Sequence, residues 1–392
     1  PKGQSMSIRN ALALSRAPAA GLTAVGVLWG SFAGLVPDIK ARVGASDGAL
    51  GAALLVSALA GMIALWAAPW VGARLGRAAL PVTGGVVSLV VMAPMLPGSV
   101  PALGAALFAM GLAVALLDIT ANVHISAAEA RHGLHLMNAN HAMFSFAFAG
   151  AAWTVGLARA ADWSAERILP GMAVVCLLLT AVMVLARPAA PAAEAEATEA
   201  PRRPPWGAIA LTGLILFAAF IGENSTEAWS ALHIERTLGA EAGHGSFGPA
   251  MLGLVMGIGR LSGQLLTVRF GDAKLIFGSA LLGCAGALTV AAAPTVQMAL
   301  AGVALTGVGM AVIVPSVNSI LGARVTEGQR AHAISRAWML GILGFFVGPS
   351  MMGGISELFG LRASFAAIAL VVALILPAVW ALSWRRAAVA GA

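Results

Sequence analysis

Long apolar runs alternate along the chain with short segments that carry charged residues, glycine or proline. Each run is continuous and close to the ~20 residues that a helix needs to cross a bilayer. A membrane β-barrel would show short segments of alternating hydrophobicity instead. The pattern predicts twelve transmembrane helices, at 17–36, 48–70, 79–96, 101–126, 137–158, 168–186, 207–230, 248–267, 275–293, 296–320, 337–356 and 364–383.

Composition supports this interpretation. Of the 392 residues, 59% are hydrophobic and 10% are charged, and the mean hydropathy is +0.90. A soluble domain carries about 25% charged residues, so this chain cannot cover a water-facing surface. The composition excludes a soluble enzyme, a disordered protein and a collagen-like fibre. The two cysteines, Cys176 and Cys284, lie inside apolar runs and predict neither a disulfide nor a metal framework.

The basic residues predict the orientation. If the N-terminus is inside, sixteen of the 23 lysines and arginines lie on the inner side and six on the outer side. Cytoplasmic segments of membrane proteins collect Lys and Arg, so both termini are expected in the cytoplasm. This bias also explains the net charge of +7 without a nucleic-acid partner, because no basic patch has interleaved aromatic residues.

A polar interruption divides the chain into two halves. Residues 187–206, RPAAPAAEAEATEAPRRPPW, have no apolar periodicity and predict a cytoplasmic linker between bundles at 1–186 and 207–392. GLAVALLDITAN at 111–122 aligns with GVGMAVIVPSVN at 307–318, a shift of 196 residues that indicates internal duplication. Two six-helix repeats related by a pseudo-twofold axis along the membrane normal are typical of the major facilitator fold.

Carboxylates inside the predicted spans are candidates for ion coupling, because a charge at the bilayer centre costs at least ~2.5–3.5 kcal/mol. Asp118 lies in the fourth span, with Asn122 one turn further on the same face. Burial disfavours the charged form of a carboxyl group, so Asp118 is a candidate to take up and release a proton; a purely structural carboxylate is the alternative. Glu223 in the seventh span is the second coupling candidate, and Glu227 is either its partner or a solvated residue near the outer end.

Other polar and aromatic residues predict a binding face. Asn138, His141 and Ser145 are spaced i, i+3 and i+7 on the fifth span, which indicates either a cavity wall or packed polar groups. Aromatic residues could stack on a solute, or anchor helix ends at the interface. No cluster has metal-ligand spacing. The predicted substrate-binding residues are Asn122, Asn138, His141, Ser145, Asn224, Glu227, Asn318, Trp29, Phe32 and Trp338.

Arg260 lies within the eighth span, shortly before an inner loop. It is expected either to pair with a carboxylate and latch the cytoplasmic side, or to bind an anionic substrate. Arg74, Arg77 and Arg269 lie in corresponding inner loops of the two halves and are expected as further latch residues.

The segments LLDITANVHI and MNANHAMFSFAFAG resemble spans four and five of the fucose permease group, which are sugar:proton symporters of the major facilitator superfamily. That group has an acid-x-x-x-Asn pattern in span four, matched by Asp118 and Asn122. In span five it has an Asn, Gln and Ser face, which Asn138 and Ser145 match while His141 replaces Gln. IGENSTEAWSALHI and VLWGSFAGLVPDIKARVG are similar to the bacterial YbjJ-type branch of the group. The fucose permeases also place an acid in span one, where the nearby acid of this chain is Asp38.

The resemblance implies a multi-pass transporter of the bacterial inner membrane, acting as a monomer in the lipid bilayer and taking up a sugar, a sugar derivative or a small carboxylate with protons. It implies no cofactor beyond the proton gradient, no enzyme activity and no nucleic-acid partner. The first alternative is a proton-driven efflux antiporter of amphipathic compounds. Span five lacks the Gly-Pro signature of many antiporters, although GPSMMGG in span eleven is a partial match. A membrane sensor or an intramembrane enzyme is the remote alternative.

Overall fold

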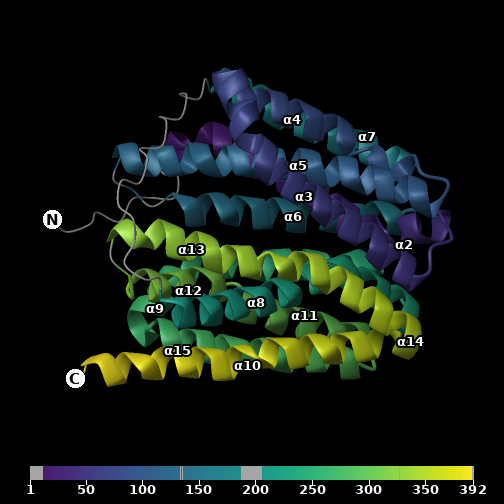
Figure 1. The fold of residues 1–392 in the computed structure, drawn as a ribbon. Helices are drawn as coiled ribbons and strands as arrows, with labels where there is room; N and C mark the ends of the chain where they lie inside the picture. The colour runs from purple at the N-terminus through teal and green to yellow at the C-terminus, as the bar shows by residue number, and fades with distance from the viewer. Residues whose placement is uncertain (1–11, 133, 135, 187–204, 326, 391–392) are drawn as a thin grey trace. The chain divides into compact units, whose positions relative to one another are not determined.

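The computed structural model describes residues 12–132, 134, 136–186, 205–325 and 327–390. Most of the predicted linker, 187–204, lies outside these ranges. All regular structure in the described residues is helical (Figure 1), so the prediction of an all-helical protein is confirmed. The helices are α2 (Arg16–Arg42), α3 (Asp47–Leu75), α4 (Ala79–Val90), α5 (Val100–His132), α6 (Met137–Ala160), α7 (Ala165–Leu185), α8 (Trp206–Leu232), α9 (Phe247–Phe270), α10 (Asp272–Ala292), α11 (Val296–Met310), α12 (Ile313–Gly322), α13 (Glu327–Gly341), α14 (Leu343–Ala373) and α15 (Ile375–Ala390).

Within the described residues, nine helical stretches are long and apolar enough to cross a membrane. Two of them, Asp47–Met95 and His332–Ser383, contain 49 and 52 residues. Because one pass needs about 20 residues, each of these two stretches has the length of two passes. The chain is therefore a multi-pass membrane protein, while the count of twelve spans stays a prediction.

A proline and a glycine mark two places where the helical backbone is interrupted or bent. The predicted span 296–320 is broken between α11 and α12, shortly before Pro315; proline has no backbone N–H to donate to the carbonyl oxygen four residues earlier, at Ala311. The long helix α14 bends at Gly360, whose φ of 80° lies in the left-handed region that favours glycine. This bend separates the predicted spans 337–356 and 364–383.

Backbone contacts group the chain into two compact units. Unit 1 comprises Pro1–Ala45, Val56–Ala193 and Glu241–Leu261, and unit 2 comprises Ser46–Leu55, Glu194–Ala240 and Ser262–Ala392. Each unit is mostly one half of the sequence, yet unit 1 includes the first part of α9 and unit 2 includes the first part of α3. The predicted division at 187–206 does not anticipate these two exchanged helix starts.

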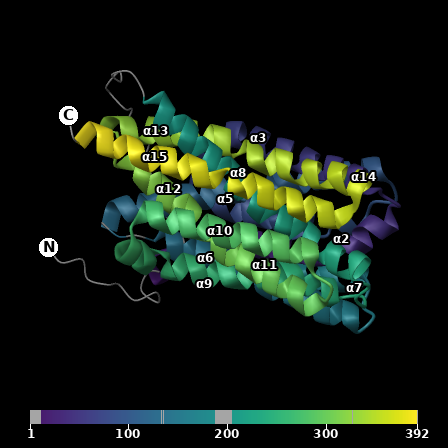
Figure 2. The same cartoon turned by 90° about the horizontal axis from the view of Figure 1, so that it is seen from below.

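Glycines let neighbouring helices approach backbone to backbone. In unit 1, α2 lies along α6, and a Cβ on Gly26 or Gly30 would overlap the carbonyl oxygen of Phe144 or Phe148. In unit 2, α10 and α11 lie side by side (Figure 2), and a Cβ on Gly302 would stand 2.7 Å from the backbone nitrogen of Val290. Small residues at helix contacts permit such packing in membranes.

We expect Gly30→Ala to destabilise the protein by about 1–3 kcal/mol, the range for overpacking a tight site. The added methyl group would force α2 away from the Phe148 carbonyl. Thermal unfolding in detergent measures the effect. Gly150→Ala on α6 is the control, because nothing lies within 4 Å of a Cβ there. Equal unfolding midpoints for the two variants would contradict the proposed packing.

Candidate functional site

Hydrogen bonds connect α5 to α6 through the predicted residues Asp118, Asn122 and His141. The Asn122 side-chain amide nitrogen donates to the backbone oxygen of Asp118 at 2.9 Å. Since that oxygen can only accept, the amide oxygen of Asn122 faces His141, whose Nε2 lies 3.1 Å away. His141 therefore donates from Nε2. One amide therefore joins the backbone of Asp118 to the imidazole of His141.

The same chain of contacts continues to Arg260 on α9. The buried Ser145 hydroxyl donates to the backbone oxygen of His141 at 3.1 Å and accepts a hydrogen bond from Nη1 of Arg260. The guanidinium carbon of Arg260 lies 6.0 Å from the centre of the Phe144 ring, within reach of a cation–π interaction. Asp118, Asn122, His141, Ser145 and Arg260 are called the interior polar network below.

Two glycines bring α9 close enough to α6 for these contacts. A Cβ on Gly253 would stand 2.7 Å from Cδ1 of Phe148 and 3.0 Å from the backbone oxygen of Ser145. A Cβ on Gly257, one turn later, would stand 2.7 Å from Cε1 of Phe146. The next turn after these glycines carries Arg260, so the close approach determines where its guanidinium lies.

The network lies far from the helix ends. At 1.5 Å per residue, Arg260 is about 15 Å from the end of α9, Asn122 about 15 Å from the end of α5, and Ser145 about 12 Å from the start of α6. These depths approach the middle of a hydrocarbon layer of about 30 Å. Ser145 is buried, and the other members of the network are half-buried.

Predicted residues in unit 2 form a second group. Trp338 on α13 donates from Nε1 to the side-chain oxygen of Asn318 on α12 at 3.2 Å. The Phe220 ring of α8 packs against Trp338, with 5.4 Å between ring centres. Further along α8, Glu223 and Glu227 are half-buried, as is Asn224 between them. The structure therefore brings Asn318 and Trp338 together beside an aromatic residue that the sequence analysis did not select.

The remaining predicted binding residues, Asn138, Trp29 and Phe32, lie outside these two groups of contacts. Asn138 is exposed in the first turn of α6, whereas Asn140 is fully buried and donates to Ser15 at 3.0 Å. The i, i+3, i+7 spacing did not indicate Asn140. On α2, the rings of Trp29 and Phe32 pack edge to face, with 5.8 Å between their centres.

Asp38, the acid that the fucose permease resemblance points to near span one, forms an ion pair at the end of α6. Arg159 donates from Nε to Asp38 at 2.8 Å and forms a second bond to the other carboxylate oxygen. Arg159 also donates to Ser246, and both residues bond to the backbone oxygen of Gly34. The Arg159 side chain is 2% exposed and that of Asp38 40%. Asp38 therefore neutralises a buried cation.

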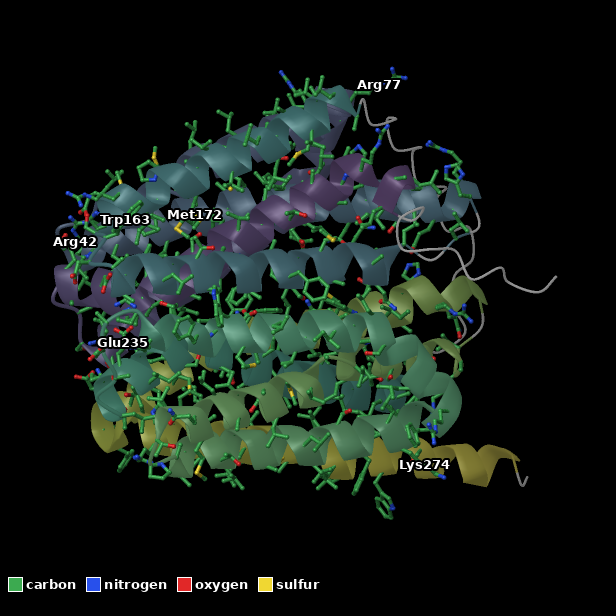
Figure 3. The ribbon with its side chains drawn as sticks, turned by 180° about the vertical axis from the view of Figure 1, so that it is seen from behind. Arg42, Arg77, Trp163, Met172, Glu235 and Lys274 are labelled. Carbon is green, nitrogen blue, oxygen red and sulfur yellow. The ribbon has the colours of Figure 1, made fainter. Side chains whose placement is uncertain are left out.

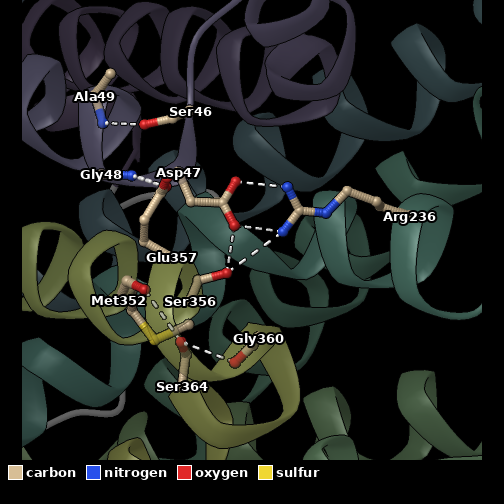
Figure 4. A network of polar contacts seen from close by, with 10 residues as sticks. All are labelled: Ser46, Asp47, Gly48, Ala49, Arg236, Met352, Ser356, Glu357, Gly360 and Ser364. Carbon is tan, nitrogen blue, oxygen red and sulfur yellow. Dashed lines mark hydrogen bonds and ion pairs between the residues drawn. The ribbon is translucent and has the colours of Figure 1, made fainter.

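A second cluster joins the start of α3 to η3 (His233–Thr237) and α14 in unit 2 (Figure 4). Arg236 donates to both carboxylate oxygens of Asp47, and the Ser356 hydroxyl donates to one of them. The backbone nitrogen of Gly48 donates to Glu357 at 3.0 Å. The Asp47 side chain is 5% exposed, so the sequence analysis missed a buried, paired carboxylate at a helix start.

The predicted latch arginines lie at the other ends of the helices. Figure 3 shows Arg77 at the end of unit 1 opposite to Arg42. Arg77 is exposed, and Arg74 and Arg269 lie over the rings of Trp70 and Phe270 on their own helices. The two buried ion pairs just described stand on the predicted outer side instead. The cytoplasmic latch stays a prediction.

Comparisons with known proteins identify the fold. Residues 263–392 match the family model described as Major Facilitator Superfamily. The chain is 25% identical to an uncharacterised MFS-type transporter of Yersinia pestis, over 87% of this chain and 88% of the relative.

Solved structures agree with this similarity. A bacterial homologue of the human lysosomal transporter Spinster superposes with a TM-score of 0.69 at 16% identity, over 97% of this chain and 98% of that one. A D-xylose-proton symporter superposes with a TM-score of 0.69 at 15% identity, over 95% and 97%. The chain therefore has the major facilitator fold, and the matched family and structures are transporters rather than enzymes.

We expect Asp38→Asn to destabilise the protein by about 3–5 kcal/mol, because it removes a carboxylate that forms two hydrogen bonds with the buried Arg159 guanidinium. Glu166→Gln is the control: its pair with Arg42 is 44% and 39% exposed, and exposed pairs contribute only about 0–1 kcal/mol. Thermal unfolding compares the two variants. If Asp38→Asn unfolds like Glu166→Gln but alters proton coupling, Asp38 has the role that the fucose permease resemblance implies instead.

Proposed function

We propose that the chain is a secondary active transporter of the major facilitator superfamily that takes up a small polar solute together with protons. The fold, the family match over 263–392 and the similarity to an MFS-type transporter support a transporter. The sequence contains no Walker motif, so the energy has to come from an ion gradient. The bias of basic residues supports a cytoplasmic location of both termini.

The observation that carries the proposal is the hydrogen-bonded connection from the backbone of Asp118 through the Asn122 amide to His141, with the Asp118 side chain one helical turn before Asn122 on α5. Asp118 is an acid at membrane depth, where the neutral form of a carboxyl group is favoured by desolvation and the charged form by hydrogen bonding. Gain or loss of its proton changes the charge near the Asn122 amide and whether the carboxyl group can donate hydrogen bonds or only accept them. A solute that bonds to Asn122 or His141 would sense that change, which is the basis of coupling in this proposal.

Both halves of the sequence contribute to the network. Asp118 and His141 belong to the first half, whereas Arg260 comes from α9 in the second half. Unit 2 by itself contains a separate group with an acid, an amide and an aromatic ring, at Glu223, Asn318 and Trp338. Transporters of this fold bind substrate between their repeats and alternate access by movement of one repeat against the other.

We expect Asp118→Asn to abolish accumulation while leaving exchange of the solute intact. In wild-type proteoliposomes with a clamped membrane potential, a gradient of one pH unit can drive about tenfold accumulation per proton, because one unit equals about 1.4 kcal/mol. The variant has no proton to exchange at residue 118, so the pH gradient should no longer drive accumulation. The ratio of solute inside to solute outside should then fall to about 1. Uptake of a panel of labelled sugars, sugar acids and small carboxylates measures this.

Glu166→Gln, which removes an exposed carboxylate, is the control and should accumulate solute as the wild type does. Unchanged pH-driven accumulation by Asp118→Asn would show that the coupling residue is elsewhere, with Glu223→Gln the next variant to assay. If no solute moves inward and cells that lack the protein become sensitive to amphipathic compounds, the protein is an efflux antiporter and the uptake proposal is wrong.

A further inference from the structure

The second half of α3 has an exposed face that the proposed transport does not use. This part of the helix belongs to unit 1. Large side chains recur along the face in steps of four residues, and Trp66 is 86% exposed and Trp70 63%. The opposite face of the same turns is buried and carries alanines, at Ala60, Ala64 and Ala68. The exposed residues Met62, Trp66, Trp70 and Arg74 are called the α3 stripe below.

Two arginines at the end of this face have no acidic partner among the described residues. The guanidinium carbon of Arg74 lies 5.2 Å from the centre of the Trp70 ring, one turn earlier on the helix. Arg77 is exposed and follows Gly76, whose φ of 51° ends the helix. Within the described part of the chain, no hydrogen bond or ion pair joins either arginine to another group. Both guanidinium groups therefore keep their hydrogen-bond donors available for a ligand.

The charge at this end of unit 1 is positive. Arg16 begins α2 and Arg131 lies in the last turn of α5, at the same end of the helices. Of the acids that the structure describes in unit 1, Glu129 stands at this end, and its carboxylate accepts hydrogen bonds from backbone nitrogens at the start of α6. A negatively charged ligand is therefore favoured there.

We propose that the α3 stripe, together with Arg77, binds an anionic phospholipid of the surrounding bilayer. The lipid phosphate bonds to Arg74 and Arg77, and one acyl chain lies along Trp70 and Trp66. The site lies apart from the residues of the proposed transport and does not depend on it. Two arginines that the sequence predicted as latch residues thus have a lipid as their ligand.

The depth of these residues matches the layers of a bilayer. The 29 residues of α3 extend over about 43 Å at 1.5 Å per residue, whereas the hydrocarbon layer is about 30 Å thick. With that layer centred on the helix, its boundary falls near Trp70, at the depth where indole rings are favoured. Arg74 then reaches the headgroup region, and Trp66 stays among the acyl chains. The α3 stripe thus has its charge at the depth of lipid phosphates and its apolar surface at the depth of lipid chains.

The chemistry of the α3 stripe favours a lipid with a net negative charge. A planar guanidinium group pairs with phosphate oxygens through two parallel hydrogen bonds, and such charge-assisted bonds are about twice as strong as neutral ones. The Trp70 ring holds the guanidinium of Arg74 beside the helix. Basic residues at a membrane surface attract anionic lipids. A zwitterionic lipid brings its own cation close to the two arginines, whereas phosphatidylglycerol brings none.

The test measures lipid binding to the purified full chain in detergent as thermal stabilisation, which grows with ligand concentration over Kd. Palmitoyl-oleoyl phosphatidylglycerol is compared with palmitoyl-oleoyl phosphatidylcholine at equal mole fractions, and the first should stabilise the wild type more strongly. The double variant Arg74→Gln/Arg77→Gln should bind phosphatidylglycerol about 10–100-fold more weakly, the effect of losing a hydrogen bond to a charged group. Equal stabilisation of the wild type by the two lipids would overturn the proposal.

Arg131→Gln is the matched control. It removes an exposed positive charge from the same end of unit 1, on α5 and outside the α3 stripe. This variant should bind phosphatidylglycerol as the wild type does. If Arg131→Gln loses as much affinity as the double variant, the lipid is attracted by the overall charge of this end, and the assignment to the α3 stripe is wrong.

Two further variants test the headgroup and the chain separately. Arg74→Lys/Arg77→Lys keeps both charges without the planar fork and should bind with intermediate affinity; it replaces the glutamine variant if that one does not fold. Trp66→Leu should weaken binding by about 4–15-fold, equivalent to the loss of one or two buried CH₂ groups, and should retain the preference for phosphatidylglycerol. Unchanged affinity in Trp66→Leu would contradict the placement of an acyl chain along the stripe.

A soluble phosphate ester distinguishes a lipid site from a solute site. The probe is sn-glycerol 3-phosphate, which carries a phosphate group without acyl chains and should not stabilise the wild type at the concentration used for the lipid. If it stabilises the wild type as phosphatidylglycerol does, and Arg74→Gln/Arg77→Gln abolishes that effect, the two arginines bind a soluble phosphate and the lipid proposal is wrong.

Discussion

Helix α6 lies between two helices that approach it through glycines, and the candidate site depends on this close packing. On one face, Gly26 and Gly30 of α2 leave no space for a side chain against the carbonyl oxygens of α6. On another face, Gly253 and Gly257 of α9 approach Ser145 and the phenylalanine rings of α6. Because hydrogen bonds weaken steeply outside a narrow range of distance and angle, larger residues at these positions would separate the polar side chains that now connect α5, α6 and α9. The polar contacts of the candidate site therefore depend on the small residues that let these helices approach.

Charged groups in this protein differ in what balances them. Arg159 with Asp38, and Arg236 with Asp47, are bidentate pairs in which a carboxylate neutralises a guanidinium directly. Such pairs fix the ends of helices, because removing one partner leaves the other charge in surroundings that water does not fill. In the interior polar network, hydrogen-bonded neutral groups stand between the acid of Asp118 and Arg260.

The grouping of the helices can be compared with the internal duplication that the sequence predicts. α3 begins at Asp47 and α9 at Phe247, close to the shift of 196 residues between the two halves. Each of these helices has its first part in the unit that consists mainly of the other half. The buried contacts of Asp47 and of Ser246 accompany the two exchanged starts. The starts of α3 and α9 thus each group with helices from the other half of the sequence. The residues that make these contacts differ between the two helix starts.

The sequence alone determined the class of the protein, because hydropathy is a local property and a bilayer demands about twenty apolar residues from each pass. Polar residues are also scarce inside the apolar runs. Asp118, Asn122, His141 and Ser145 were therefore conspicuous in the sequence. Only the tertiary structure decided the partners. Arg159 and Asp47 stand at helix ends, where charged residues are common, and their burial depends on helices more than one hundred residues away in the chain. Arg260 was visible in the sequence, but its position over Phe144 follows from the approach of α9 to α6, a long-range contact that no local pattern encodes.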